Sequence, residues 1–218
     1  MPRTQEIQVF TFEELSDSAK EHALYKYHYD SFQWSDEAPV ETLKAFADVF
    51  PIKIKDWSYD SQSANASWMF RDYLSGDIEN LTGIRLAKYI WNNYRKELFK
   101  PKFIGSLKTN EYVQHKRIKS PREPYANGNR FNPYYSGCQI DTSCVLTGCC
   151  FDEDILEPVY SFLKKPDATT DFNDLIQDCI SNWEVSVRKQ AEWESSMEYF
   201  AEICEINEYE FTESGERF

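Results

Sequence analysis

The sequence predicts an α+β fold, in which one domain over residues 1–218 has a mostly antiparallel sheet covered by four or five helices. Short segments in which apolar and polar residues alternate, such as 52–55, indicate strands that pair as hairpins. Other segments carry apolar residues at helical spacing. The 6 Trp, 14 Tyr and 15 Phe residues supply enough apolar surface for one sizeable core, which excludes a disordered acidic chain.

The first fifty residues predict a strand followed by two helices. Residues 6–10 alternate as a short strand. Thr11 and Glu14 have the spacing of a capping box, and the helix after them is expected to reach about Tyr29, with Ser16 or Asp17 as its N-cap. A second helix is expected to begin at Pro39 and to end before Pro51.

The middle of the chain predicts a hairpin, a helix and a further strand. Strands are expected over 52–55 and 66–70, joined by a polar loop over 56–65 in which Asn65 is suited to a positive φ. Apolar residues at helical spacing predict a helix over 81–99, which Pro101 ends. Alternation over 138–147 predicts a strand with Cys138 and Cys144 on its apolar face.

The last third of the chain, residues 151–218, is expected to be mostly helical and acidic. A short helix with Pro158 near its start, a long helix over 171–193 and a further helix over 196–206 are predicted. Residues 1–150 hold 19 Lys+Arg and 19 Asp+Glu, whereas residues 151–218 hold 5 and 18. The formal charge of −13 therefore lies wholly in the last 68 residues.

Metal, cofactor and catalytic signatures are absent from the sequence. The chain has three His and six Cys residues, and the closest Cys residues have the spacing C-x5-C-x4-C-C with no His nearby, unlike the close pairs of a zinc site. We expect Cys179 to pack in the core as a small apolar side chain. No nucleophile, metalloprotease or phosphate-loop motif occurs, so we predict no metal, no cofactor and no enzyme. A site built from carboxylates that meet only in space stays open.

Three segments resemble the motifs of one family of phage and prophage proteins. Residues 11–21 match T-F-x-E-L-S-x-x-A-K-E, residues 147–158 are similar to T-G-x-C-x-D-x-D-I-L-x-P, and residues 207–218 match N-E-Y-E-F-T-x-x-G-x-R-F. Members of this family are commonly labelled putative antitoxins of a toxin–antitoxin stability system. The resemblance implies phage or prophage origin and a bacterial host protein, a toxin or defence component, as partner. It supplies no catalytic residues.

One loop departs from the family pattern. The family usually has a Gly-rich hairpin, W-S-Q-G-D-G-A-S-F, whereas residues 61–68 here read S-Q-S-A-N-A-S-W. Gln62, Asn65 and Trp68 are therefore candidate loop residues: if the family loop binds a ligand, that activity is changed or lost in this chain. The alternative, which we favour, is that the family motif is only a tight turn, which Gly and Asp commonly mark.

The first functional hypothesis is a non-enzymatic interaction protein that binds and blocks a bacterial toxin or defence protein. Its acidic residues would occupy a basic surface of the partner and speed the encounter. The candidate partner-binding residues are Glu192, Glu194, Glu198, Glu202, Glu205, Glu208 and Glu210. The alternative for this segment is a solvated helix surface, which is the commoner role of a charge run.

The second hypothesis is nucleic-acid binding through the basic stretch 96–130, which holds nine basic and three acidic residues. Its candidate residues are Lys116, Arg117, Lys119, Arg122 and Tyr125. The competing interpretation, which we favour, is a basic loop that balances the acidic end of the same chain. No apolar run approaches the roughly 20 residues that span a bilayer, and the N-terminus lacks a signal peptide, so we expect the cytoplasm of the bacterial host.

Overall fold

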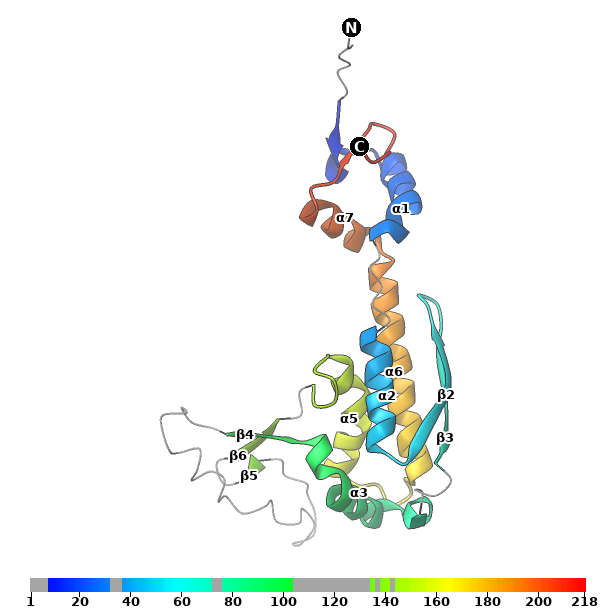
Figure 1. Ribbon diagram of the computed structural model, residues 1–218, viewed down its shortest axis with the longest axis vertical. Helices are drawn as coiled ribbons and strands as arrows, with labels where there is room; N and C mark the ends of the chain where they lie inside the picture. Colours follow the sequence, from blue (N-terminus) through cyan, green and yellow to red (C-terminus); the bar gives the residue numbers. More distant parts are fainter. Residues whose placement is uncertain (1–7, 32–36, 72–75, 104–133, 136–137, 142–143) are drawn as a thin grey trace. The chain divides into compact units, whose positions relative to one another are not determined.

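The computed structural model describes residues 8–31, 37–71, 76–103, 134–135, 138–141 and 144–218 (Figure 1). Helices dominate it, and its strands form three small antiparallel sheets with the orders β1-β7, β2-β3 and β4-β6-β5. The predicted α+β class and the antiparallel pairing are confirmed.

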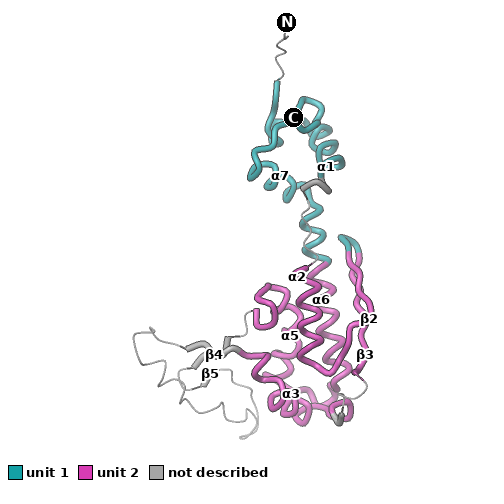
Figure 2. The backbone as a smooth tube through the Cα atoms, viewed as in Figure 1, with its two compact units in different colours: residues 1–35, 60–62, 188–218 teal, residues 36–59, 63–187 magenta. Residues whose placement is uncertain are grey.

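The chain divides into two compact units (Figure 2). Unit 1 comprises residues 1–35, 60–62 and 188–218, and unit 2 comprises residues 36–59 and 63–187. Each unit has its own cluster of buried apolar side chains. The sequence pattern gave no boundary at residue 187, because that position lies inside a continuous helix, α6.

Unit 2 contains most of the helices around the larger apolar cluster. Its elements are α2 (Glu37–Val49), β2 (Ile52–Tyr59), β3 (Ala64–Phe70), η2 (Gly76–Asn80), α3 (Gly83–Leu98), α5 (Phe151–Lys164) and the first part of α6 (Phe172–Glu194). Trp183 of α6 is fully buried, and its indole N–H donates to the carbonyl oxygen of Pro39 at 2.9 Å. A buried indole requires such a partner, so this bond fixes how α6 lies against the start of α2.

The hairpin in unit 2 is longer than the sequence predicted. Strands β2 and β3 pair from Ile52↔Phe70 to Tyr59↔Ala64, with a bulge at Lys55, so the expected polar loop over 56–65 is wrong except at its tip. Tyr59 extends β2 because its ring packs edge-to-face on Trp183, with the centroids 6.0 Å apart.

Helix α5 begins at Phe151, seven residues before the predicted start, and Pro158 lies in its interior. A proline inside a helix deprives the carbonyl four residues earlier of its N–H donor. Here that carbonyl belongs to Asp154, and the Asn182 side-chain amide of α6 donates to it at 3.3 Å. The predicted boundary at Pro158 is therefore wrong, because a neighbouring helix supplies the missing hydrogen bond.

Of the strand predicted over 138–147, residues 138–141 are confirmed and residues 144–147 are not. The third sheet consists of β4 (Lys100–Phe103), β5 (Tyr134–Tyr135) and β6 (Cys138–Asp141). Cys144 has a positive φ of 47° and lies half-buried in a turn, not on a strand face. The turn is held by Asp152, as described next, so the expected strand is wrong over residues 144–147.

The Asp152 side chain is fully buried and organises the turn that precedes α5. One carboxylate oxygen accepts the backbone N–H groups of Leu146, Thr147 and Gly148 at 2.8, 2.7 and 3.1 Å. The other oxygen accepts the hydroxyls of Thr42 and Thr147 at 2.9 and 2.8 Å. Five hydrogen bonds satisfy the buried charge, so Asp152 joins the turn to α2.

Unit 1 joins the two ends of the chain. Its elements are β1 (Phe10–Thr11), η1 (Phe12–Glu14), α1 (Asp17–Ser31), the end of α6, α7 (Met197–Ile206) and β7 (Glu210–Phe211). Strand β1 pairs with β7 through Phe10↔Phe211 and Thr11↔Glu210. The buried cluster consists of Phe12, Leu15, Ala19, Ala23, Phe200, Cys204 and Phe211.

The predicted starts of the unit 1 helices are confirmed. Glu14 accepts the backbone N–H of Thr11 at 2.9 Å, so the predicted capping box is present. It caps the start of the short helix η1 and not the start of α1. The Ser16 hydroxyl accepts the N–H of Ala19 at 3.4 Å at the start of α1. Ser196 caps α7 by accepting the N–H of Tyr199 at 3.1 Å.

Candidate functional site

The sequence-predicted residues fall into three groups. The nucleic-acid candidates Lys116, Arg117, Lys119, Arg122 and Tyr125 lie outside the described residues. The loop candidates lie at or near the hairpin tip, with Gln62 in the turn and Asn65 and Trp68 in β3. The acidic candidates all lie in unit 1, on the end of α6, on α7 and in the segment that follows α7.

Two of the three loop candidates have structural partners in unit 2. Asn65 is an exposed strand residue paired with Ser58, so the positive φ expected for it is wrong. The Trp68 indole N–H donates to the Gln177 side chain of α6 at 3.3 Å. The pairing of Asn65 joins β3 to β2, and the Trp68 hydrogen bond joins β3 to α6.

The seven predicted glutamates differ in exposure and in what they line. Six of them are exposed, and Glu194 is half-buried. Three of them, Glu205, Glu208 and Glu210, line a groove in unit 1 together with Glu13, which the sequence analysis did not single out. We call this feature the acidic groove.

The acidic groove has a volume of about 450 Å³ and an apolar floor. Its complete lining is Thr11, Phe12, Glu13, Ala201, Cys204, Glu205, Glu208, Tyr209 and Glu210. Phe12 and Cys204 are 5% and 2% exposed and belong to the buried cluster of unit 1, so the floor is an edge of the core. The four glutamates are exposed and form its polar rim.

The backbone that ends α7 places Glu208 and Tyr209 in the groove. The N–H of Tyr209 donates to the Cys204 carbonyl at 2.9 Å and that of Glu208 to the Glu205 carbonyl at 3.1 Å, the pair of bonds of a Schellman motif. The residue at the turn of this motif is usually Gly, because its φ is positive. Here it is Glu208, with φ 53°. A residue with a side chain therefore occupies a position at which a positive φ makes a side chain unfavourable.

Burial keeps the thiol in the groove floor neutral. Burial raises the pKa of Cys204 to about 12, with only a small opposing effect of Arg217. A thiol with so high a pKa is not a nucleophile at neutral pH. The floor therefore offers apolar contact and no reactive group.

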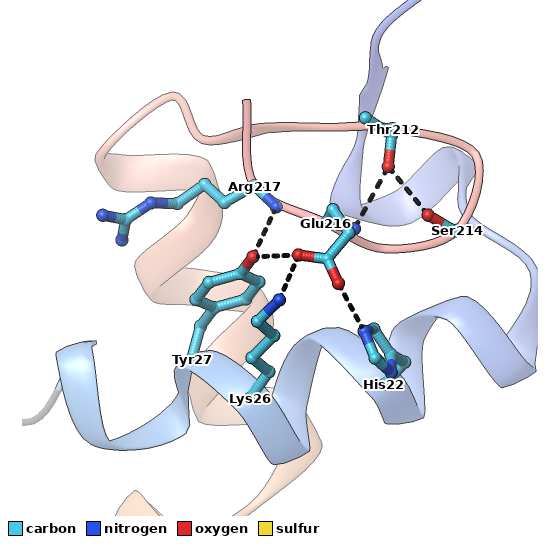
Figure 3. A network of polar contacts seen from close by, with 7 residues as sticks. All are labelled: His22, Lys26, Tyr27, Thr212, Ser214, Glu216 and Arg217. Carbon is cyan, nitrogen blue, oxygen red and sulfur yellow. Dashed lines mark hydrogen bonds and ion pairs between the residues drawn. The ribbon is translucent and has the colours of Figure 1, made fainter.

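The Glu216 carboxylate, near the end of the chain, contacts three side chains of α1 (Figure 3). Glu216 accepts the Lys26 ammonium, the Tyr27 hydroxyl at 2.7 Å and a His22 ring nitrogen at 3.0 Å. These hydrogen bonds, of which the one from Lys26 has the largest effect, lower the pKa of Glu216 to about 2. In turn, the hydrogen bond to Glu216 raises the pKa of Lys26. The Glu216 contacts tie the end of the chain to α1.

The C-terminal turn is fitted closely to α1. The Tyr27 hydroxyl, which donates to Glu216, accepts the backbone N–H of Arg217 at 3.0 Å. Gly215 has φ 83°, and a Cβ atom there would lie 2.2 Å from the Ala19 carbonyl oxygen. Only glycine fits this approach.

Arg217 is also engaged within unit 1. Its guanidinium lies 4.8 Å from the ring centroid of Tyr209 and 5.6 Å from that of Tyr27. In the described part of unit 1, both ion pairs within 4 Å go to Glu216. No such pair in that part involves Glu13, Glu205, Glu208 or Glu210.

Phe12, Glu13 and Tyr209 are the site residues that sequence reasoning missed. Phe12 and Glu13 come from the opposite end of the chain, and only the pairing of β1 with β7 brings them to α7. Tyr209 had a usable signal, because residues 208–211 alternate as E-Y-E-F, which places the aromatic rings inward and the carboxylates outward.

No group of three or more His, Cys, Asp or Glu side chains within the described ranges is arranged to hold a metal ion. None of the helices in the described part of the chain has the length and apolar character that crossing a bilayer requires. Comparison of the chain with protein-family models, curated proteins and solved structures found no match.

Proposed function

We propose that this chain is a phage- or prophage-encoded interaction protein that binds and blocks a bacterial toxin or defence protein without catalysing a reaction. The observation that carries the proposal is the acidic groove, in which an apolar floor meets four exposed carboxylates that form no ion pair within 4 Å in the described structure. The resemblance of residues 11–21 and 207–218 to antitoxin-labelled phage proteins supports it, since both segments build unit 1.

The charge distribution suits stoichiometric binding to a basic surface. Residues 188–218 hold nine Glu and three Lys or Arg. A concentration of one sign of charge steers an oppositely charged partner and raises the association rate, while desolvated apolar contact slows dissociation. Toxins and defence proteins that act on nucleic acids carry basic surfaces of this kind. An acidic protein seated on such a surface blocks access to it, and we place this action in the bacterial cytoplasm.

An affinity pull-down with mass spectrometry from lysate of a host carrying its native defence systems tests the proposal. The variant replaces Glu198, Glu202, Glu205 and Glu208 by Lys, and the matched control makes the same charge change in unit 2. The exposed control positions are Glu37, Glu41, Glu79 and Glu97.

We expect the wild type and the unit 2 control to capture the same host protein and the unit 1 variant to lose it. The captured protein, once purified, should lose its toxic or defence activity when one equivalent of wild-type chain is added. Equal capture by all three chains, or capture without inhibition, would contradict the proposal.

A further inference from the structure

We propose that the acidic groove receives a lysine or arginine side chain from an extended basic segment of the partner protein. This inference rests on the proposed function and specifies the chemistry of its binding site. The aliphatic stem of the side chain lies on Phe12 and Cys204, and its cationic head lies among the rim carboxylates. Long basic side chains commonly bury their stems on apolar surface and keep the head in a polar setting.

The size of the groove fits a side chain with its adjoining backbone. Pockets that hold small ligands have volumes of about 300–1,000 Å³. The value here, about 450 Å³, lies toward the lower end of that range. The groove is thus suited to one anchoring side chain and not to a whole helix.

The charges in the groove select a cation. Glu13, Glu205, Glu208 and Glu210 all line the groove, so its opening holds a concentration of negative charge. An ammonium or guanidinium group placed among them gains charge-assisted hydrogen bonds. An uncharged side chain of the same length gains only the contact with the floor.

The chain already binds a cation against one of the groove residues. The guanidinium of Arg217 lies 4.8 Å from the ring centroid of Tyr209, which lines the groove. Tyr209 is therefore held where its ring interacts with a guanidinium. The apolar floor argues for a side chain with a stem and against a bare metal ion, and the described residues offer no metal-ligand group.

Fluorescence anisotropy on the full-length chain tests the inference with a labelled Gly/Ser peptide that carries arginine at alternate positions. Three matched peptides replace arginine by lysine, by citrulline, or by diaminopropionate. Citrulline keeps the shape and removes the charge, whereas diaminopropionate keeps a charge and removes the stem. We expect the arginine and lysine peptides to bind, and the other two to bind at least about tenfold more weakly.

Variants of the protein locate the binding. Glu208→Gln with Glu210→Gln removes two rim charges, and Ala201→Leu fills the floor without changing any charge. Glu37→Gln with Glu41→Gln makes the same charge change at exposed positions of unit 2, outside the groove. We expect the first two variants to weaken arginine-peptide binding about tenfold, and the third to leave it within about twofold. Thermal unfolding of each variant checks that it is folded.

Three results would overturn the inference. If the citrulline or the diaminopropionate peptide binds as tightly as the arginine peptide, binding does not require both the aliphatic stem and the positive charge. Equal losses from the two double Gln variants would show that total charge, and not the groove, governs binding. Saturable binding of spermidine in the groove, with no peptide binding, would make a polyamine the occupant. A captured host protein that binds Ala201→Leu as well as wild type would contradict the groove assignment and leave the proposed function standing.

Discussion

The substitution Glu208→Gly separates the stability of the acidic groove from its binding. Glu208 has φ 53° at the turn that ends α7, and its side chain is exposed on the groove rim. A left-handed conformation costs an L-residue roughly 1–2 kcal/mol, whereas glycine adopts it freely but loses about 0.5–1 kcal/mol of additional chain entropy on folding. The net expected gain is about 0.5–1 kcal/mol.

Chemical denaturation of wild type, Glu208→Gly and Glu208→Gln at pH 7 measures the two contributions. Glu208→Gln removes the charge and keeps the strained backbone, so we expect most of the stabilisation only in Glu208→Gly. The gain corresponds to a rise in melting temperature of about 1–4 °C for a chain of this size. Both variants should lose affinity for the arginine peptide.

If Glu208→Gly is no more stable than Glu208→Gln, the left-handed backbone at residue 208 has no conformational free-energy cost, which would refute the prediction. Full peptide binding by Glu208→Gly would show that its carboxylate is not part of the binding rim. A variant that is more stable and binds less cannot be explained by unfolding, so the expected result assigns Glu208 to function.

Three further predictions concern the contacts that hold each unit together. Gly215→Ala should destabilise unit 1 by about 2–4 kcal/mol in urea unfolding, because the new Cβ would lie 2.2 Å from the Ala19 carbonyl oxygen. The control Gly148→Ala has φ 93° but no atom within 4 Å of the new Cβ, so it should lower the free energy of unfolding by only about 1 kcal/mol. The contribution of Glu216 to the free energy of unfolding should be fully present above its ordinary pKa of 4.5 and should be lost as the pH falls toward about 2. The stability difference between wild type and Glu216→Gln should therefore disappear over that pH range. Asp152→Asn should lower the free energy of unfolding by about 3 kcal/mol and speed hydrogen exchange at the three backbone amides that donate to the carboxylate. The reason is that the asparagine NH2 group is itself a donor and cannot accept these hydrogen bonds. Unchanged exchange would contradict the anchoring role.

The sequence predicted the elements whose stability is local. The long helix expected over 171–193 is found as α6, Phe172–Glu194, and the helix expected over 196–206 is found as α7. The apolar periodicity of both and the cap at Ser196 lie within the element itself, and Cys179 and Cys204 are buried. Such signals can be read from the chain without knowing what lies beside it.

The errors occurred where a distant residue decides the local structure. Pro158 stays inside α5 because Asn182 supplies a hydrogen bond to the Asp154 carbonyl, and no pattern near Pro158 indicates that donor. The turn before α5 is held by the buried Asp152, whose other oxygen accepts the hydroxyl of Thr42, 110 residues away in α2. The acidic groove has the same character, since α7 supplies predicted glutamates but Phe12 comes from the other end of the chain.

The energetics of unit 1 connect its stability to its partner. Lys26 and His22 contact Glu216, and Arg217 lies over the rings of Tyr27 and Tyr209, so none of these side chains forms an ion pair with a rim carboxylate. The strained backbone at Glu208 lowers the stability of the free chain. A basic ligand in the groove binds the folded state and not the unfolded one, so it must raise the unfolding free energy by mass action. Binding and stabilisation therefore report the same interaction, and screening by salt must weaken both together.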